Sequence, residues 1–232
     1  FALKIFTQPA KTITQKKQIK LTDKEIEKIK QTIIYKDKYI IGINKPSGLA
    51  VQSGTKIEKS LNDFLPYLKF ENSESPRLVH RLDKDTSGII ILARDRKNAE
   101  ILSEYFKNKD DKLEKIYLAV AVGKFSKNEG IINYPLIKKI ENGVEKVYKD
   151  EKDGKEATTI YRVLDYSEKY NISLVELKIL TGRTHQIRVH LKEIGHPILG
   201  DGKYGGKKAF VDELSNTLHL HSFRLNIKDL HR

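Results

Sequence analysis

The chain has 232 residues, of which 38% are hydrophobic and 32% are charged, a balance typical of a soluble globular protein. It contains no cysteine, which excludes disulfides and thiolate metal sites, so we expect a reducing, cytoplasmic environment. No apolar run approaches the roughly 20 residues of a membrane helix, and we expect no membrane partner. The formal net charge of +13 predicts a polyanionic partner, with nucleic acid as the first candidate.

The N-terminal residues are polar and rich in lysine, with a short helical pattern at 24–30. We expect this region to be a connector rather than part of the core. The segments 33–35 and 39–44 are rich in β-branched side chains, which predicts two strands. The string Lys45-Pro46-Ser47-Gly48 then predicts a turn, because proline restricts one backbone dihedral and glycine relaxes another.

The middle of the chain alternates between helical and strand patterns. Leucine and phenylalanine recur at helical spacing over 61–68, and a second amphipathic helix is expected at 98–106. Continuous apolar runs at 87–93 and 117–122 predict two buried strands. A hairpin turn is expected at 141–143, where Glu-Asn-Gly interrupts the pattern.

The last third of the chain predicts three more strands, at 158–166, 172–180 and 218–227. A helix is expected at 185–194, and a glycine-rich loop at 200–206. That loop lacks the Gly-Lys-Ser/Thr ending of a phosphate-binding loop, which argues against a nucleoside triphosphate ligand. Because strands outnumber helices without regular alternation, we expect an α+β fold with a large mixed or mostly antiparallel sheet.

Asp83 is a carboxylate surrounded by basic or titratable residues in the sequence. It precedes the predicted strand 87–93, so we expect it on a short loop at the start of that strand, where the sheet can hold it in position. Neighbouring cations keep a carboxylate ionised, and an anion pressed against a nucleic acid indicates chemistry. A helix cap or a surface ion pair is the alternative role. The neighbours are Arg77, His80, Arg81 and Lys84.

Two further segments offer candidates for the same site. Tyr117 opens an apolar strand, which favours a core position, although an aromatic ring beside a nucleic-acid cleft can stack on a base. Arg183 is expected at a strand-to-helix corner, where a forked guanidinium could hold a carboxylate ionised. Thr184 is the expected cap of the following helix. His185 and His190 are five residues apart, which does not suit a helical metal pair, so we expect no metal.

In this order, the segments resemble the RluA-type pseudouridine synthases over residues 33–227. The strings that carry the resemblance are Asn44-Lys45-Pro46, His80-Arg81-Leu82-Asp83, Thr86-Ser87-Gly88 and Gly182-Arg183-Thr184-His185-Gln186-Ile187-Arg188. The resemblance implies a mixed, largely antiparallel central sheet flanked by helices, with a catalytic cleft and without metal or cofactor. It also implies a reaction in which the base of a uridine is detached, rotated and rejoined through carbon 5.

Within the family, the chain looks most like the RluC branch, which modifies bacterial large-subunit (23S) ribosomal RNA. The resemblance implies that Asp83 is catalytic, that Tyr117 stacks on the target base, and that Arg183 pairs with Asp83. Arg81 matches a residue that enters the RNA stack when the uridine is flipped out. The expected RNA-binding residues are Arg81, His80, Lys45, Arg188 and Lys84.

The expected domain organisation places the catalytic domain at 33–232. Residues 1–32 are then a basic linker from an N-terminal RNA-binding domain that this chain lacks, and the protein is expected to be a monomer. Three alternatives remain open at this point: the same chemistry on transfer RNA or another RNA, a non-catalytic RNA-binding or ribosome-assembly protein, and a glycosidase that releases the base.

Overall fold

The computed structural model describes residues 20–54, 57–107, 112–141 and 143–228. The first part of the chain forms α1 (Asp23–Lys30), β1 (Ile33–Lys36), β2 (Ile40–Lys45), α2 (Leu61–Phe64), the 3-10 helix η1 (Leu65–Leu68), β3 (Arg77–Leu78), β4 (Ser87–Ala93) and α3 (Arg96–Lys107). The second part forms β5 (Leu113–Val122), β6 (Glu129–Asn133), β7 (Leu136–Glu141), β8 (Val144–Lys149), β9 (Thr158–Ser167), β10 (Ile172–Ile179), α4 (Gln186–Glu193), the 3-10 helix η2 (Gly206–Ala209) and β11 (Leu220–Ile227).

A nine-stranded sheet runs through the molecule in the order β1-β2-β4-β11-β5-β10-β9-β6, with β3 added beside β4. Its named strand pairs are antiparallel except β4 with β11, which is parallel. Strands β7 and β8 form a separate hairpin. The predicted α+β class with a mixed, mostly antiparallel sheet is therefore confirmed. Among the described residues, no helix is long and apolar enough to cross a membrane.

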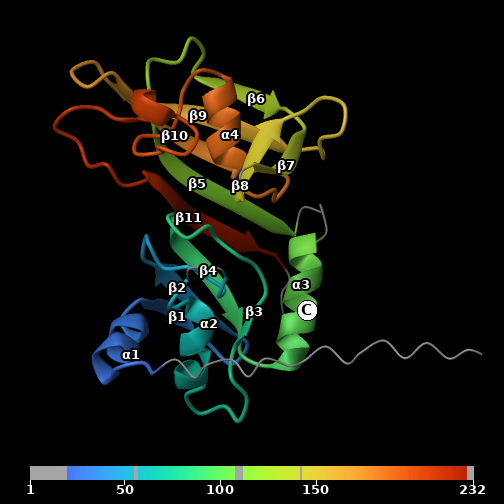
Figure 1. Ribbon diagram of the computed structural model, residues 1–232. Helices are drawn as coiled ribbons and strands as arrows, with labels where there is room; N and C mark the ends of the chain where they lie inside the picture. The colour runs from blue at the N-terminus through green and yellow to red at the C-terminus, as the bar shows by residue number, and fades with distance from the viewer. Residues whose placement is uncertain (1–19, 55–56, 108–111, 142, 229–232) are drawn as a thin grey trace, which may run out of the picture.

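The sheet extends through two lobes, which Figure 1 shows one above the other. The N-lobe contains α1, β1, β2, α2 and β4, and its core includes Ile41, Ile90 and Leu92. The C-lobe contains β5, β6, β9, β10 and α4, and its core includes Val175 and Leu177. Strand β11 lies between the lobes, because it pairs with β4 on one side and β5 on the other.

Strand β4 matches its prediction in both length and burial. Ile90 and Leu92 belong to the N-lobe core, whereas Ile91 and Ala93 pack with Leu102 of α3 on the opposite face. A strand covered on both faces needs an apolar residue at nearly every position, which is the run that the sequence displays.

The folded unit starts earlier than the expected boundary at residue 33. Ile29 of α1 is only 6% exposed and belongs to the N-lobe core, and Leu21 packs against the same cluster. Thr22 and Glu25 form a capping box that starts the helix. Helix α1 is thus part of the N-lobe, and the rest of the expected linker, residues 1–19, lies outside the described residues.

The single helix expected at 61–68 is instead a turn of α-helix followed by the 3-10 helix η1. Pro66 lies in the first turn of η1, and because proline has no N–H it cannot continue the α-helical hydrogen bonds. Strand β5 begins four residues before the prediction, since its first residues, Leu113 to Ile116, pair with the end of β11. The expected turn at 141–143 joins β7 to β8, but Asn142 is outside the described residues.

The connection between the lobes depends on a close backbone approach at Gly88. This residue pairs with Ser222 of β11 and has a φ of +106°. A Cβ atom added here would lie 2.2 Å from the carbonyl oxygen of Ser222, which is far inside van der Waals contact. Only glycine therefore permits β4 and β11 to pair at this point.

We predict that Gly88→Ala lowers the free energy of unfolding by more than about 3 kcal/mol, because backbone atoms must move apart. Gly195→Ala is the matched control, since Gly195 also has a positive φ but no described atom lies within 4 Å of its added Cβ. We expect the control to cost about 1 kcal/mol. Urea unfolding followed by circular dichroism measures both, and equal losses would contradict the steric explanation.

Candidate active site

One cavity, with a volume of about 110 Å³, collects five of the eight residues that the sequence nominates. Its walls come from the loop before β4, from β5 and β11, and from the corner between β10 and α4. The nominated residues that line it are Arg81, Asp83, Tyr117, Arg183 and Arg188. Segments about 100 residues apart in the sequence thus meet at the junction of the two lobes.

Asp83 lies on the short loop that leads into β4, as expected. Its backbone carbonyl accepts a hydrogen bond from the amide of the buried Thr86, which closes a turn. The carboxylate is 20% exposed, so solvent and a ligand can reach it from the cavity. Its titratable partner is His185, with 3.7 Å between Asp83 Oδ2 and His185 Nε2.

Lys45 holds the Asp83 loop from behind rather than facing RNA. Its side chain is fully buried, and Nζ donates to the carbonyls of Pro46 at 2.9 Å, Leu49 at 2.8 Å and Lys84 at 3.0 Å. These three bonds use all the donors of an ammonium group. Burial lowers the pKa of Lys45 to about 8, although Asp85 and Asp83 act in the opposite direction. The prediction that Lys45 contacts RNA is therefore wrong.

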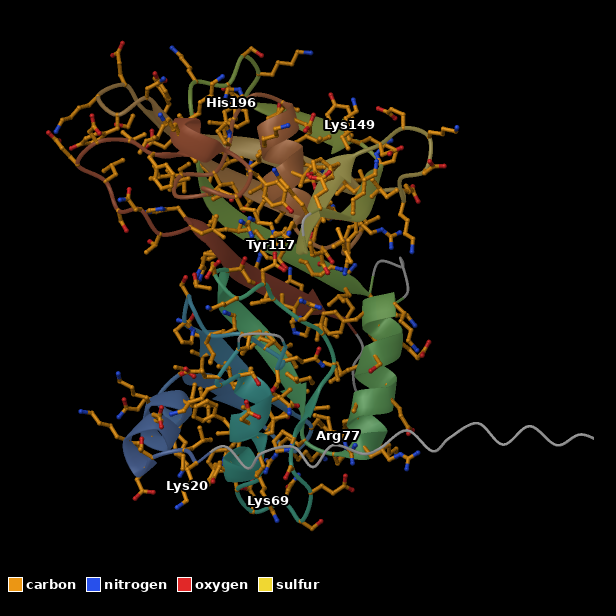
Figure 2. The ribbon with its side chains drawn as sticks, viewed as in Figure 1. Lys20, Lys69, Arg77, Tyr117, Lys149 and His196 are labelled. Carbon is orange, nitrogen blue, oxygen red and sulfur yellow. The ribbon has the colours of Figure 1, made fainter. Side chains whose placement is uncertain are left out.

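Tyr117 lies in β5 between the two lobes, as Figure 2 shows. Its side chain packs against both hydrophobic cores and also lines the cavity. Burial raises the pKa of Tyr117 to about 12, and the negative charge of Asp83 acts in the same direction. The phenol therefore stays protonated near neutral pH. The core position is confirmed, and contact with a base stays a prediction.

Arg183 reaches the cavity but does not pair with Asp83 in this structure. It is exposed, and its Nε donates to the backbone carbonyl of Glu156 at 3.0 Å. The corner that carries it is built by Gln186, whose Oε1 accepts from the Arg183 amide at 3.1 Å and from the hydroxyl of Thr181 at 2.7 Å. The expected ion pair is thus absent, and the guanidinium stays at the mouth of the cavity.

The start of α4 also differs from the prediction. The cap position belongs to His185, not to Thr184, and its side chain makes no capping hydrogen bond. The Gln186 side chain instead folds back over the corner and accepts a hydrogen bond from the Arg183 amide. His185 has a left-handed backbone with a φ of +53°, which turns the chain from the loop into the helix.

Arg188 lines the cavity, but its guanidinium is bound to Asp201. Nε and Nη2 donate to the two carboxylate oxygens at 2.8 and 2.7 Å, and the pair is almost wholly buried. A bidentate pair of this kind anchors the loop after Leu199 against α4. This pairing gives Arg188 a structural role, and RNA binding by the residue stays a prediction.

His80 is likewise a structural residue. Its Nε2 accepts a hydrogen bond from the amide of Ile91 at 2.9 Å, and its ring stacks on Phe106 with centroids 4.1 Å apart. Burial lowers the pKa of His80 to about 3, and Lys115 contributes in the same direction. The hydrogen bond and the ring stacking hold His80 between β4 and α3, and RNA binding by this residue stays a prediction.

Arg81 and Lys84 are exposed on the Asp83 loop, and RNA binding by both stays a prediction. Arg81 lines the cavity beside Asp83, whereas the Lys84 carbonyl serves as an acceptor for Lys45. Across the described residues, no group of three or more histidine and acidic side chains is placed to bind a metal ion.

His185 and Tyr204 belong to the site, although the sequence analysis assigned neither to it. His185 Nδ1 and the Tyr204 hydroxyl are 2.6 Å apart. His185 stands in the string that carries the family resemblance, which is the signal that the sequence offers for it. Tyr204 follows Asp201 in the glycine-rich loop, and a polar aromatic residue close to an acidic residue is the signal that the sequence offers.

We predict that Lys45→Met lowers the free energy of unfolding by roughly 3 kcal/mol, because three buried carbonyls lose their donor. Lys84→Met, in the adjacent loop, is the matched control, since the Lys84 side chain is exposed, and we expect less than about 0.5 kcal/mol. Urea midpoints at pH 7 measure both changes. A Lys45→Met protein as stable as the control would contradict the role assigned to Lys45.

Comparison with known proteins agrees with this geometry. Residues 39–193 match the family model described as RNA pseudouridylate synthase. A protein named ribosomal large subunit pseudouridine synthase C from Rickettsia conorii is 39% identical, and the match covers 93% of this chain and 71% of that protein. The protein of the same name from Vibrio parahaemolyticus is 34% identical, with 89% and 64% covered. An Arabidopsis thaliana protein named RNA pseudouridine synthase 4, mitochondrial, is 38% identical, with 90% and 48% covered.

Solved structures show the same fold. The structure described as human RNA pseudouridylate synthase domain containing 4 superposes with a TM-score of 0.71 at 29% identity, covering 86% of this chain and 85% of that one. Human RNA pseudouridylate synthase domain containing 1 gives a TM-score of 0.69 at 28% identity, covering 85% and 78%. The chain therefore belongs to the RNA pseudouridylate synthase family and is an RNA-modifying isomerase.

Proposed function

We propose that this protein converts uridine to pseudouridine in large-subunit ribosomal RNA, with Asp83 as the catalytic carboxylate. The observation that carries the proposal is the accessible Asp83 carboxylate, which shares one cavity with Tyr117, Arg81 and Arg183. The relatives from Rickettsia and Vibrio are named for the large ribosomal subunit, which supports this substrate over transfer RNA. A net charge of +13 suits a long RNA.

The chemistry needs one anionic oxygen near the anomeric carbon of the target nucleotide. Breaking a carbon–nitrogen glycosidic bond develops positive charge on the sugar, and a carboxylate either attacks that carbon or stabilises the charge. The detached uracil is an acceptable leaving group and is recaptured through carbon 5, so a second carboxylate is not required. Direct attack on the sugar, attack on the ring and an elimination route all begin from the same placement of Asp83.

The other cavity residues supply binding and shape. Tyr117 offers an aromatic face and a protonated hydroxyl beside Asp83, which suits stacking on the flipped base. Arg81 is exposed on the Asp83 loop, where its side chain can fill the gap that a flipped uridine leaves in the RNA stack. Arg183, held at the cavity mouth by a single hydrogen bond to a carbonyl, is available to turn toward the carboxylate when RNA arrives.

The substrate is tested by tritium release from ribosomal RNA whose uridines carry tritium at carbon 5. Isomerisation replaces that carbon–hydrogen bond, so we expect release from large-subunit RNA and much less from transfer RNA. Equal release from the two RNAs would contradict the assignment to ribosomal RNA but not the isomerase activity. Free uracil among the products would favour a glycosidase, and a non-catalytic RNA-binding protein would release nothing. The cytoplasmic location and the monomeric state remain predictions.

We predict that Asp83→Asn lowers the single-turnover rate by at least about 10³-fold, because the neutral amide cannot stabilise a cationic sugar. RNA affinity should change less than about threefold. Asp85→Asn is the matched control on the same loop and should keep nearly the normal rate, since the Asp85 side chain is exposed and does not line the cavity. Collapse of RNA binding in Asp83→Asn would instead indicate a structural role.

We predict that Arg183→Lys slows turnover by roughly 100-fold, because a point charge does not reproduce a planar, forked donor. Arg162→Lys is the control, since Arg162 is exposed and forms only a surface ion pair with Glu176. The comparison uses single-turnover rates at saturating enzyme, where differences in RNA affinity no longer contribute. A near-normal rate in Arg183→Lys would refute its pairing with Asp83 in the RNA complex.

A further inference from the structure

His185 faces the Asp83 carboxylate, yet none of the roles assigned above uses it. Its side chain is 13% exposed and lines the cavity, and Nε2 lies 3.7 Å from Asp83 Oδ2. The residue has a left-handed backbone at the position just before α4 begins. Outside glycine, such a conformation is uncommon and costs free energy, which makes the position worth a functional explanation.

A fixed chain of hydrogen bonds determines which imidazole nitrogen carries the proton. The backbone N–H of Val147 donates to the Tyr204 hydroxyl oxygen at 3.2 Å. That oxygen lies 2.6 Å from His185 Nδ1. Burial raises the pKa of Tyr204 to about 12, so the phenol keeps its proton at neutral pH. With one lone pair of its oxygen taken by Val147, the Tyr204 O–H is free to donate to Nδ1.

The opposite arrangement leaves two groups unsatisfied. If Nδ1 carried the proton and donated to Tyr204, the Tyr204 hydroxyl proton would have no acceptor among the described residues. The lone pair of Nε2 would then face the negative oxygen of Asp83, which is electrostatically unfavourable. The neutral tautomer with hydrogen on Nε2 gives the Tyr204 hydroxyl proton an acceptor, and it aims an N–H donor at the carboxylate 3.7 Å away.

We propose that His185 is a positioning residue, which presents a neutral Nε2–H to Asp83 and fixes the carboxylate orientation for attack on the target nucleotide. This inference rests on the proposed function of Asp83. A shift of about 0.7 Å would shorten the present separation to hydrogen-bond length. A neutral N–H donor orients one carboxylate oxygen without placing a further positive charge beside it.

The surroundings of His185 favour its neutral form. Burial lowers the pKa of His185, and the positive charges of Arg188 and Lys203 act in the same direction, against the effects of Asp83 and Asp201. The hydrogen bonds also connect the site to the β7–β8 hairpin, because Val147 belongs to β8. A second contact to the same hairpin comes from Lys203, whose Nζ donates to the Glu145 carbonyl at 2.7 Å. The hairpin thereby holds Tyr204, which in turn holds His185.

A pair of substitutions separates positioning from mere packing. His185→Gln keeps an amide donor close to the place of Nε2, whereas His185→Leu has a similar volume and no donor. Neither residue is β-branched, so the left-handed backbone penalises both to a similar degree. We expect His185→Leu to slow single-turnover tritium release roughly 100-fold and His185→Gln less than about tenfold, with RNA affinity within about threefold for both.

The tautomer is read directly by long-range ¹H–¹⁵N spectra, with the His185 signals assigned by their loss in His185→Gln. We expect the pattern of an Nε2-protonated ring in the wild type and a mixture of tautomers in Tyr204→Phe, together with a rate loss of about tenfold. An Nδ1-protonated ring in the wild type, or equal rates in His185→Leu and His185→Gln, would overturn the proposal. If the wild-type protein releases tritium and His185→Leu releases it at the same rate, this inference alone is overturned. If the wild-type protein releases none, the proposed function is overturned as well.

Discussion

The buried ammonium of Lys45 is the interaction on which the site depends. Loops cannot bury their carbonyl groups without donors, and three carbonyls from the turn after β2 and from the Asp83 loop converge on this one nitrogen. A second bond, from the Gly48 amide to the Lys84 carbonyl, joins the same two loops. The Asp83 carboxylate is therefore carried by a short loop that is tied in place by a residue 38 positions away in the sequence.

The basic side chains near Asp83 form two groups, one buried and one exposed, with different roles. Lys45 and Arg188 are buried and hydrogen-bonded within the protein, to carbonyls in one case and to Asp201 in the other. Arg81 and Arg183 are exposed, and they remain available to RNA. Buried charges must be satisfied within the protein, so burial, more than residue type, decides which cations can meet a phosphate.

The junction of the lobes explains why the cavity lies where it does. Tyr117 packs on both cores, Gly88 permits β4 to approach β11, and the corner before α4 closes the third side. Each lobe alone contributes only part of the cavity wall. A rigid sheet that passes through both lobes keeps these parts in register, which preorganised catalysis requires.

The sequence by itself determined the fold class, the family and the strands β1, β2, β4, β5, β9, β10 and β11, because apolar periodicity and short motifs are local properties. It did not predict β3, β6, β7 and β8. It placed Asp83 before β4 and Arg183 at the corner before α4, and the structure agrees on both positions. Burial could not be read from the sequence: Lys45 and Arg188 look like RNA contacts there but are buried and bonded to other parts of the chain, and His80 is stacked on Phe106. Only the tertiary structure decided this, and only it placed Tyr204 behind His185, since hydrogen-bond partners many residues apart leave no periodic trace in the chain.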